Sequence, residues 1–358
     1  MTPRDWEANA RDLAWSCAPV TGEALSFHRS LDGYAPSPLV ELPEVAASLG
    51  VGRALAKDES SRFGLPAFKV LGASWAVRRA LEARLRGDQS SITFVTASDG
   101  NHGRAVARTA RLLGHRARVF VPDGVSAAAV EGIEAEGAPV VAVAGSYDRA
   151  VAAAAAFADA EGAVLLQDTA WPGYEQVPAW IVEGYSTLFA EADEQVATVG
   201  EAAPDLVVVP TGVGSLLQAA VMYYRSRPEP ARTAVMSVEP AVAACVLASL
   251  RAGRAVSVPT QVTTMAGLNC GTVSSLAWPV LRAGLDAAVA VDDAEAAAAA
   301  PILQAAGVDA GPCGCAALAG AVAALTGRDA DARRAALRIG PDATVLLIVT
   351  EGLAANPG

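Results

Sequence analysis

From about residue 53 to the C-terminus, short apolar segments alternate with longer helical patterns, and this alternation restricts the fold more than any other feature. Such an order is typical of β-α-β units with a mainly parallel sheet. We therefore predict an α/β protein. The expected strands are 53–56, 92–96, 117–121, 139–143, 163–167, 206–210, 234–238, 287–291 and 344–350, with helices that include 70–86, 104–113, 148–160 and 178–193.

Open α/β sheets bind ligands beyond the carboxyl ends of their strands. Three polar or glycine-rich segments directly follow predicted strands, and the first of them contains Lys69. The chain has only one other lysine, Lys57, and nearly all its remaining basic residues are arginine. A lysine amine forms an imine with an aldehyde, which a guanidinium does not.

Lys69 ends the segment Ser60-Ser61-Arg62-Phe63-Gly64-Leu65-Pro66-Ala67-Phe68-Lys69 and stands at the start of the helix expected from Val70. The positive end of the helix dipole and the apolar neighbours would both lower the pKa of its amine. The alternative is a lysine that extends from a half-buried helix end into water.

The second segment is Thr96-Ala97-Ser98-Asp99-Gly100-Asn101-His102-Gly103. Its backbone N–H groups and amide suit a planar ring or a carboxylate. The alternative is a turn in which Asp99 or Asn101 caps the next helix.

The third segment is Pro210-Thr211-Gly212-Val213-Gly214-Ser215, before a helix expected near Leu216. Small residues and a hydroxyl at a helix N-terminus suit a phosphate monoester. Leu217 occupies the last position of the dinucleotide fingerprint, which disfavours a nicotinamide dehydrogenase. An imine lysine, an asparagine turn and a phosphate loop together match the needs of pyridoxal phosphate.

At this point the sequence resembles the fold type II pyridoxal-phosphate enzymes, and among them the diaminopropionate ammonia-lyase family. The resemblance spans nearly the whole chain, and its most specific part combines Arg-Phe-Gly-Leu, Ala-Phe-Lys and Asp-Gly-Asn-His-Gly. The matching segments are Tyr34-Ala35-Pro36-Ser37-Pro38-Leu39, Lys57-Asp58-Glu59-Ser60-Ser61-Arg62-Phe63-Gly64-Leu65, Ala67-Phe68-Lys69, Asp99-Gly100-Asn101-His102-Gly103-Arg104, Gln167-Asp168-Thr169-Ala170-Trp171, Gly173-Tyr174, Gly212-Val213-Gly214, Val238-Glu239-Pro240, Met265-Ala266-Gly267-Leu268 and Thr350-Glu351-Gly352.

The resemblance implies pyridoxal 5'-phosphate as cofactor, a small amino acid as substrate and a homodimer. It implies that Lys69 forms the Schiff base and removes the α-proton of an L-amino acid, whereas Asp99 takes the proton of the D-isomer. It further implies that Asp168 binds the 3-amino group and helps it leave. The implied cofactor contacts are Asn101 with the ring 3-hydroxyl, Gly212, Val213, Gly214 and Ser215 with the phosphate, and Thr350 with the ring nitrogen.

Two segments depart from the family pattern. Gly311-Pro312-Cys313-Gly314 stands where the family has Gly-Glu-Ser-Gly, and Val349-Thr350-Glu351-Gly352-Leu353 stands where it has Ser-Thr-Glu-Gly-Asp. The loss of the carboxylate at Pro312 could change the electronics of the cofactor or the choice of substrate. Cys245 and Cys270 fall where the family can carry cysteines, so a redox-sensitive pair is one alternative, and free thiols are the expected state in a reducing compartment.

We predict a large cofactor-binding domain formed by residues 1–74 and 173–358, and a small inserted α/β domain formed by residues 75–172, with the cofactor between them. The expected reaction converts 2,3-diaminopropionate to pyruvate and ammonia. Alternatives are a serine or threonine dehydratase, a β-replacement enzyme and a catalytically silent relative that keeps the fold.

The net charge, the apolar segments and the cysteine spacing argue against several other classes of protein. The formal net charge is −11 with no dense basic cluster, so we expect no nucleic-acid partner. We find no membrane span, no secretory signal and no cysteine spacing that would bind zinc or build a disulfide scaffold. We therefore expect a cytoplasmic enzyme without a metal.

Overall fold

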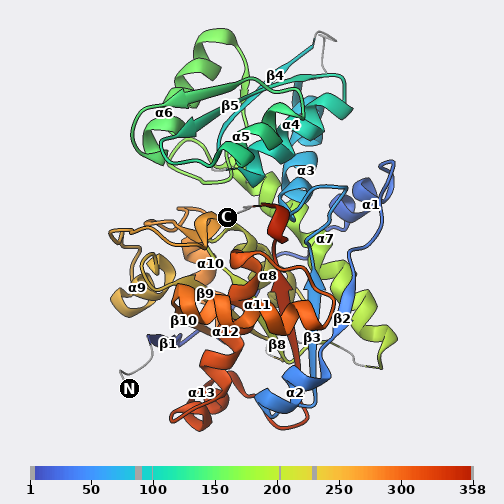
Figure 1. The fold of residues 1–358 in the computed structure, drawn as a ribbon, viewed down its shortest axis with the longest axis vertical. Helices are drawn as coiled ribbons and strands as arrows, with labels where there is room; N and C mark the ends of the chain where they lie inside the picture. Colours follow the sequence, from blue (N-terminus) through green and yellow to red (C-terminus); the bar gives the residue numbers. More distant parts are fainter. Residues whose placement is uncertain (1–4, 85–90, 99, 201–202, 228–231, 356–358) are drawn as a thin grey trace.

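The computed structural model describes residues 5–84, 91–98, 100–200, 203–227 and 232–355. Its strands form one sheet of seven strands and one of four. In Figure 1 the four-stranded sheet and its helices form the upper part, and the seven-stranded sheet lies in the lower part. The predicted α/β fold is confirmed.

The seven-stranded sheet has the order β1-β10-β9-β8-β11-β3-β2. Its five central strands are parallel, and the two edge strands are antiparallel to their neighbours. The strands are β1 (Trp6–Ala8), β2 (Leu39–Glu41), β3 (Arg53–Asp58), β8 (Leu206–Pro210), β9 (Ala234–Pro240), β10 (Ala287–Val291) and β11 (Thr344–Val349).

Strand β11 shows why the central strands are apolar throughout. Val345, Leu347 and Val349 pack into one hydrophobic core, and Leu346 and Ile348 pack into the other. Successive side chains point to opposite faces of a strand, so a strand covered on both faces needs apolar residues at every position.

Helices cover both faces of this sheet. One core includes residues of α3 (Lys69–Arg84), α7 (Gln176–Thr198), α8 (Ser215–Arg225) and α10 (Ala277–Gly284), and it continues into residues of the four-stranded sheet and its helices. The other core includes residues of α2 (Pro43–Leu49), α11 (Asp293–Ala305), α12 (Pro312–Leu325) and α13 (Ala330–Leu337). The remaining elements of this part are α1 (Glu23–Arg29), α9 (Cys245–Ala252) and the short 3-10 helices η1 (Ala266–Leu268) and η2 (Leu353–Ala355).

The four-stranded sheet is parallel and has the order β6-β5-β4-β7. Its core places Val95, Ala97 and Phe120 against the alanine-rich face of α6, which contributes Ala150 and Ala154. The strands are β4 (Thr93–Ala97), β5 (Arg116–Pro122), β6 (Val140–Val143) and β7 (Val164–Leu165), and the helices are α4 (Asn101–Leu112), α5 (Ala127–Glu134) and α6 (Tyr147–Glu161).

All nine predicted strands are present, and β8 and β10 have the predicted bounds. The predicted strand 163–167 is shortened to the two residues of β7, and the edge strands β1 and β2 were not predicted. Helix α4 begins three residues before the predicted start, and α7 extends beyond both predicted ends. Residues 85 and 86 of the first predicted helix lie outside the described residues.

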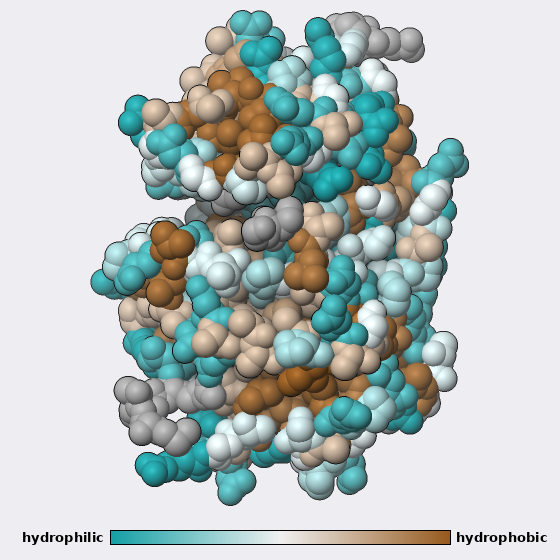
Figure 2. All heavy atoms as spheres, in the orientation of Figure 1, coloured by the Kyte–Doolittle hydropathy of each residue, from teal (hydrophilic) through white to brown (hydrophobic). Residues whose placement is uncertain are grey.

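The four-stranded sheet uses only residues between Thr93 and Leu165, whereas strands from both sides of that segment build the seven-stranded sheet. On this basis we still propose the division into a domain of residues 1–74 and 173–358 and an inserted domain of residues 75–172. The first boundary falls within α3, which packs on both α4 and α7. Figure 2 shows a hollow between the two parts on one side of the molecule. Across the described ranges, no helix is long and apolar enough to cross a membrane.

Candidate active site

A cavity of about 600 Å³ lies between the two sheets, beyond the carboxyl ends of β4, β8 and β11. Every predicted site residue that the structure describes lines this cavity. These residues are Lys69, Asn101, Asp168, Gly212, Val213, Gly214, Ser215 and Thr350. Asp99, the remaining predicted catalytic residue, lies outside the described residues.

Lys69 is the first residue of α3, as predicted. The preceding chain turns tightly at Phe63 and Gly64, whose φ angles of 52° and 72° lie in the left-handed region. The backbone N–H of Phe68 then donates to the carbonyl of Thr350 at 3.2 Å. The turn and this bond bring Lys69 from the end of β3 to the cavity beside the end of β11.

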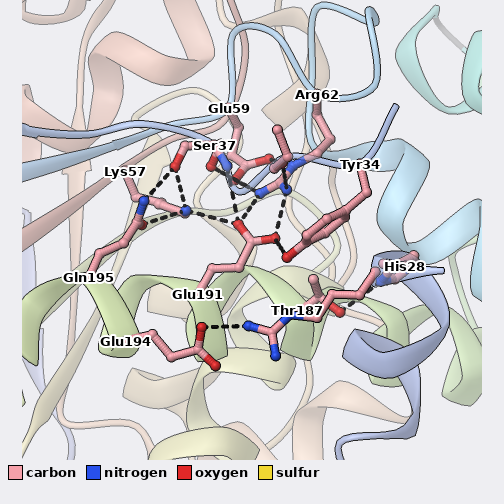
Figure 3. A network of polar contacts seen from close by, with 12 residues as sticks. His28, Tyr34, Ser37, Lys57, Glu59, Arg62, Thr187, Glu191, Glu194 and Gln195 are labelled. Atoms are coloured by element: carbon pink, nitrogen blue, oxygen red, sulfur yellow. Dashed lines mark hydrogen bonds and ion pairs between the residues drawn. The ribbon is translucent and has the colours of Figure 1, made fainter. Parts of the chain in front are cut away.

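A buried network of charges holds the start of this turn (Figure 3). The guanidinium of Arg62 is 1% exposed and donates to Glu59 at 2.6 Å and to Glu191 of α7 at 2.7 Å. These charge-assisted bonds tie the chain before Lys69 to α7.

Lys57 belongs to the same network and is not a surface lysine. Its ammonium donates to the carbonyl of Ser37 at 2.8 Å, to Glu191 at 2.9 Å and to Gln195 Oε1 at 2.8 Å. An ammonium offers three donors on a compact charge, so it suits these three oxygens better than a planar guanidinium. Lys57 is therefore structural, and Lys69 is the one lysine of the chain that lines the cavity.

Lys69 forms an ion pair with Asp168, and its Nζ lies 2.6 Å from Oδ2. Burial lowers the pKa of Lys69, but the charge of Asp168 outweighs burial and raises the pKa above its ordinary value. Burial raises the pKa of Asp168, but the charge and hydrogen bond of Lys69 lower it to about 2. The expectation of a lowered lysine pKa is therefore wrong for this state, because it did not include the carboxylate.

The asparagine turn is held by Ser98. Its Oγ accepts hydrogen bonds from the backbone N–H groups of Gly100 at 3.0 Å and Gly103 at 2.8 Å. Helix α4 begins at Asn101 after Gly100, which makes no side-chain cap. Asn101 is thus not a helix cap, and its Nδ2 instead donates to Glu351 Oε2 at 2.7 Å.

The glycine loop has little room for side chains. A Cβ atom on Gly212 would lie 3.0 Å from Cys270 Sγ and 3.2 Å from the carbonyl oxygen of Gly267. Gly214 has a φ of 97° and is followed by Ser215, the first residue of α8. A glycine loop before a helix of 11 residues leaves backbone N–H groups for an anion.

Thr350 follows β11 and is 3% exposed. Its Oγ1 is buried and has no hydrogen-bond partner among the described residues, as is also true of Thr169 Oγ1 and Asn269 Oδ1 in the same wall. Buried polar atoms are normally satisfied, so these three are suited to bind a polar ligand.

Glu351 and Cys313 also line the cavity, and the sequence did not predict either as a site residue. Glu351 Oε1 accepts from the backbone N–H of Cys313 at 3.3 Å. The turn that lacks a carboxylate at Pro312 therefore receives one from the end of β11. The sequence feature that could have identified Glu351 is its position directly after a predicted strand, where open sheets bind ligands.

The cavity wall is rich in acid. Its described residues include three carboxylates, those of Asp148, Asp168 and Glu351, against the single ammonium of Lys69. His102 adds no full charge near neutral pH, because burial lowers its pKa. The wall therefore favours a ligand that carries an amine.

Comparison with known proteins agrees with this geometry. The family model for "Pyridoxal-phosphate dependent enzyme" matches residues 31–351. The diaminopropionate ammonia-lyase of Salmonella typhimurium is 39% identical over 298 residues, which are 78% of this chain and 74% of that protein. The Escherichia coli K12 enzyme is 37% identical over 273 residues, or 72% and 68%.

The chain belongs to the diaminopropionate ammonia-lyase family. Its fold matches the crystal structure of the family enzyme from Escherichia coli in complex with an aminoacrylate-PLP azomethine reaction intermediate. The TM-score is 0.91 at 32% identity, with 98% of this chain and 94% of that chain covered. The predicted family, the fold type II architecture and the cofactor pyridoxal 5'-phosphate are confirmed.

The cavity fits this cofactor. Lys69 can hold the aldehyde carbon, the loop from Gly212 to Ser215 can hold the phosphate, and the unpartnered Thr350 Oγ1 can meet the ring nitrogen. These roles remain our assignments within the family.

All five cysteines, including Cys245 and Cys270, are thiols. Both lie beside the glycine loop. Cys245 Sγ lies 3.8 Å from the carbonyl oxygen of Gly212, and Cys270 Sγ would lie 3.0 Å from a Cβ atom on Gly212. Burial raises the pKa of Cys245, so this thiol stays protonated.

Proposed function

We propose that this protein eliminates ammonia from 2,3-diaminopropionate, and that the product takes up water to give pyruvate and a second ammonia. The observation that carries this proposal is the Lys69–Asp168 pair in an acid-rich cavity. The amine can accept the proton at Cα, and the ionised carboxylate can bind the leaving group as an ammonium that already carries its proton.

When bound, pyridoxal phosphate supplies an aldehyde for the substrate amine and a ring that withdraws electrons from Cα. Lys69 would supply the amine that holds this aldehyde, and when that amine is released in its neutral form it would accept the Cα proton of the L-isomer. Its position at the start of α3 is fixed by the bond from Phe68 to Thr350 and by the Arg62 network.

Asp168 is the partner of the leaving amine. Its low pKa keeps the carboxylate ionised, so it attracts the 3-ammonium group of the substrate. Its backbone is fixed by Ser215, whose Oγ donates to the Asp168 carbonyl at 2.7 Å. The same hydrogen bond connects the phosphate loop to the residue that binds the leaving group.

The charge of the wall separates diaminopropionate from serine and threonine. Once the α-amine is joined to the cofactor aldehyde, serine and threonine have no free amine, whereas diaminopropionate keeps its 3-amine, which can face the Asp168 carboxylate at the acidic wall. Dehydration of serine or threonine and β-replacement are therefore less favoured. For the D-isomer, we propose that Asp99 accepts the Cα proton.

Pyruvate formation from each enantiomer of 2,3-diaminopropionate tests this function. We expect pyruvate and two equivalents of ammonia, and a lower kcat/KM with serine or threonine. Absence of pyruvate from both enantiomers would refute the substrate. Asp99→Asn should lower activity on the D-isomer more than on the L-isomer, and equal losses would refute the role of Asp99.

We also propose a cytoplasmic location and a homodimer. Five cysteines that remain thiols fit a reducing compartment. The dimer is proposed from the family resemblance, and sedimentation of the purified holoenzyme measures it directly.

A further inference from the structure

One hydrogen bond crosses the cavity between the two sheets. Asn101 Nδ2, at the start of α4, donates to Glu351 Oε2 at 2.7 Å, although the two residues are 250 positions apart. Asn101 belongs to the part with the four-stranded sheet, and Glu351 directly follows β11 of the seven-stranded sheet. This bond therefore sets the amide of one part against a carboxylate of the other.

The carboxylate of Glu351 is held in place. The residue is 3% exposed, its backbone forms a bridge with Ala67, and its carbonyl accepts from the N–H of Gly311 at 2.9 Å. Its Oε1 accepts from the N–H of Cys313 in the first turn of α12. Burial and the nearby Glu351 raise the pKa of the Cys313 thiol, which therefore remains a donor.

A carboxylate accepts hydrogen bonds and donates none. It therefore selects the nitrogen of the Asn101 amide and repels its oxygen. Because an amide nitrogen has two N–H groups, one donor of Asn101 remains available after the bond to Glu351 is made. A fixed carboxylate thus decides which end of the amide faces the cavity.

We propose that Glu351 is a positioning residue that fixes the amide orientation of Asn101, so that one N–H of Asn101 points to the cofactor's ring oxygen. The proposal rests on the proposed function only in assigning Asn101 to that oxygen. Glu351 acts through Asn101, and Cys313 supports Glu351.

Glu351→Gln tests this role because glutamine keeps the shape but can present either an oxygen or an N–H to Asn101. The measurement is the dissociation constant of the cofactor, from absorbance titration of the apoenzyme without substrate. We expect about five- to tenfold weaker binding of pyridoxal phosphate, the usual effect of replacing a charged hydrogen bond by a neutral one.

The same titration with 3-deoxypyridoxal phosphate, which lacks the ring hydroxyl, removes the group that Asn101 is proposed to meet. The penalty of Glu351→Gln should then fall below about twofold, since coupling disappears when one partner is absent. An equal penalty with both compounds, or no penalty with pyridoxal phosphate, would overturn the proposal.

Glu295→Gln is the matched control, because Glu295 caps α11 and does not line the cavity. Its dissociation constants for pyridoxal phosphate and for 3-deoxypyridoxal phosphate should stay within about twofold of those of the unsubstituted protein, as expected for a distant site. If Glu295→Gln showed the same penalty as Glu351→Gln, the penalty would not depend on contact with Asn101, and the proposal would be overturned. These titrations need no substrate, so a failure of the diaminopropionate assignment leaves their outcome unchanged.

Discussion

Glu191 is the carboxylate whose loss should damage the fold most directly. It accepts from Lys57 at 2.9 Å and from Arg62 at 2.7 Å, and all three side chains are at most 1% exposed. Replacement by glutamine keeps the volume but leaves two buried cations with Glu59 as their remaining carboxylate in the network.

The expected cost follows from this burial. Removing one partner of a buried ion pair costs about 3–5 kcal/mol, because the remaining charge stays desolvated. The total stability of a folded protein is about 5–15 kcal/mol, so the variant should lose a large share of it. Because Arg62 anchors the turn before Lys69, the variant should also bind the cofactor more weakly.

Urea unfolding of the apoenzyme measures this loss. Glu194→Gln is the matched control, since Glu194 lies on the same helix and its pair with Arg29 is exposed on both sides, 57% and 48%. An exposed pair contributes about 0–1 kcal/mol. If Glu191→Gln unfolds within about 1 kcal/mol of Glu194→Gln, the network does not stabilise the fold as we argue.

Three further changes test separate parts of the site. Asp168 has a pKa of about 2 in the folded protein, below its ordinary value of 3.8, so the stability it contributes is present above about pH 4 and is lost as the pH falls towards 2. In apoenzyme urea melts, Asp168→Asn should remove this acid-side loss, and an unchanged pH dependence would contradict it. Gly212→Ala should weaken cofactor binding at least about tenfold in absorbance titrations, because the new Cβ meets Cys270 Sγ and the Gly267 carbonyl. Gly340→Ala, whose Cβ meets no atom within 4 Å, should leave the affinity unchanged, and equal affinities for the two alanine variants would argue against close packing of the loop. Asp148→Asn should raise KM for 2,3-diaminopropionate several-fold with little change in Tm, because Asp148 is exposed at the cavity wall. An unchanged KM would weaken the charge argument for the substrate.

The parts of the fold that could be predicted are those buried on both faces. Every residue of β8 and β10 is buried, which produces an uninterrupted apolar segment, and both strands have the predicted bounds. Strands β1 and β2 have three residues each and lie at sheet edges, so they leave no comparable pattern. Their pairing depends on partners that are distant in the sequence.

The start of α4 could not be predicted from helix propensity either. Gly100 and Gly103 disfavour a helix by propensity, yet Ser98 Oγ binds the N–H groups of both residues and the helix begins at Asn101. A side-chain contact therefore outweighed the propensity.

In the site, the sequence located the segments that follow strand ends but could not show which of their residues meet. The pKa of Lys69 depends on Asp168, which is 99 positions away, and the orientation of Asn101 depends on Glu351. The family resemblance supplied roles for Lys69, Asp168 and Asn101, whereas the contact of Glu351 with Cys313 required the structure.

The central claim is that Lys69 carries the cofactor, and the chain provides an unusually clear test because it has only two lysines. Borohydride reduction of the holoenzyme, followed by peptide mass spectrometry, should place one reduced cofactor on Lys69. Lys57 should remain unmodified, since it is fully buried in its ion network. Lys69→Ala should yield no labelled peptide. Label on Lys57, or an unlabelled Lys69 in protein that shows the visible absorption of the bound cofactor, would contradict the account.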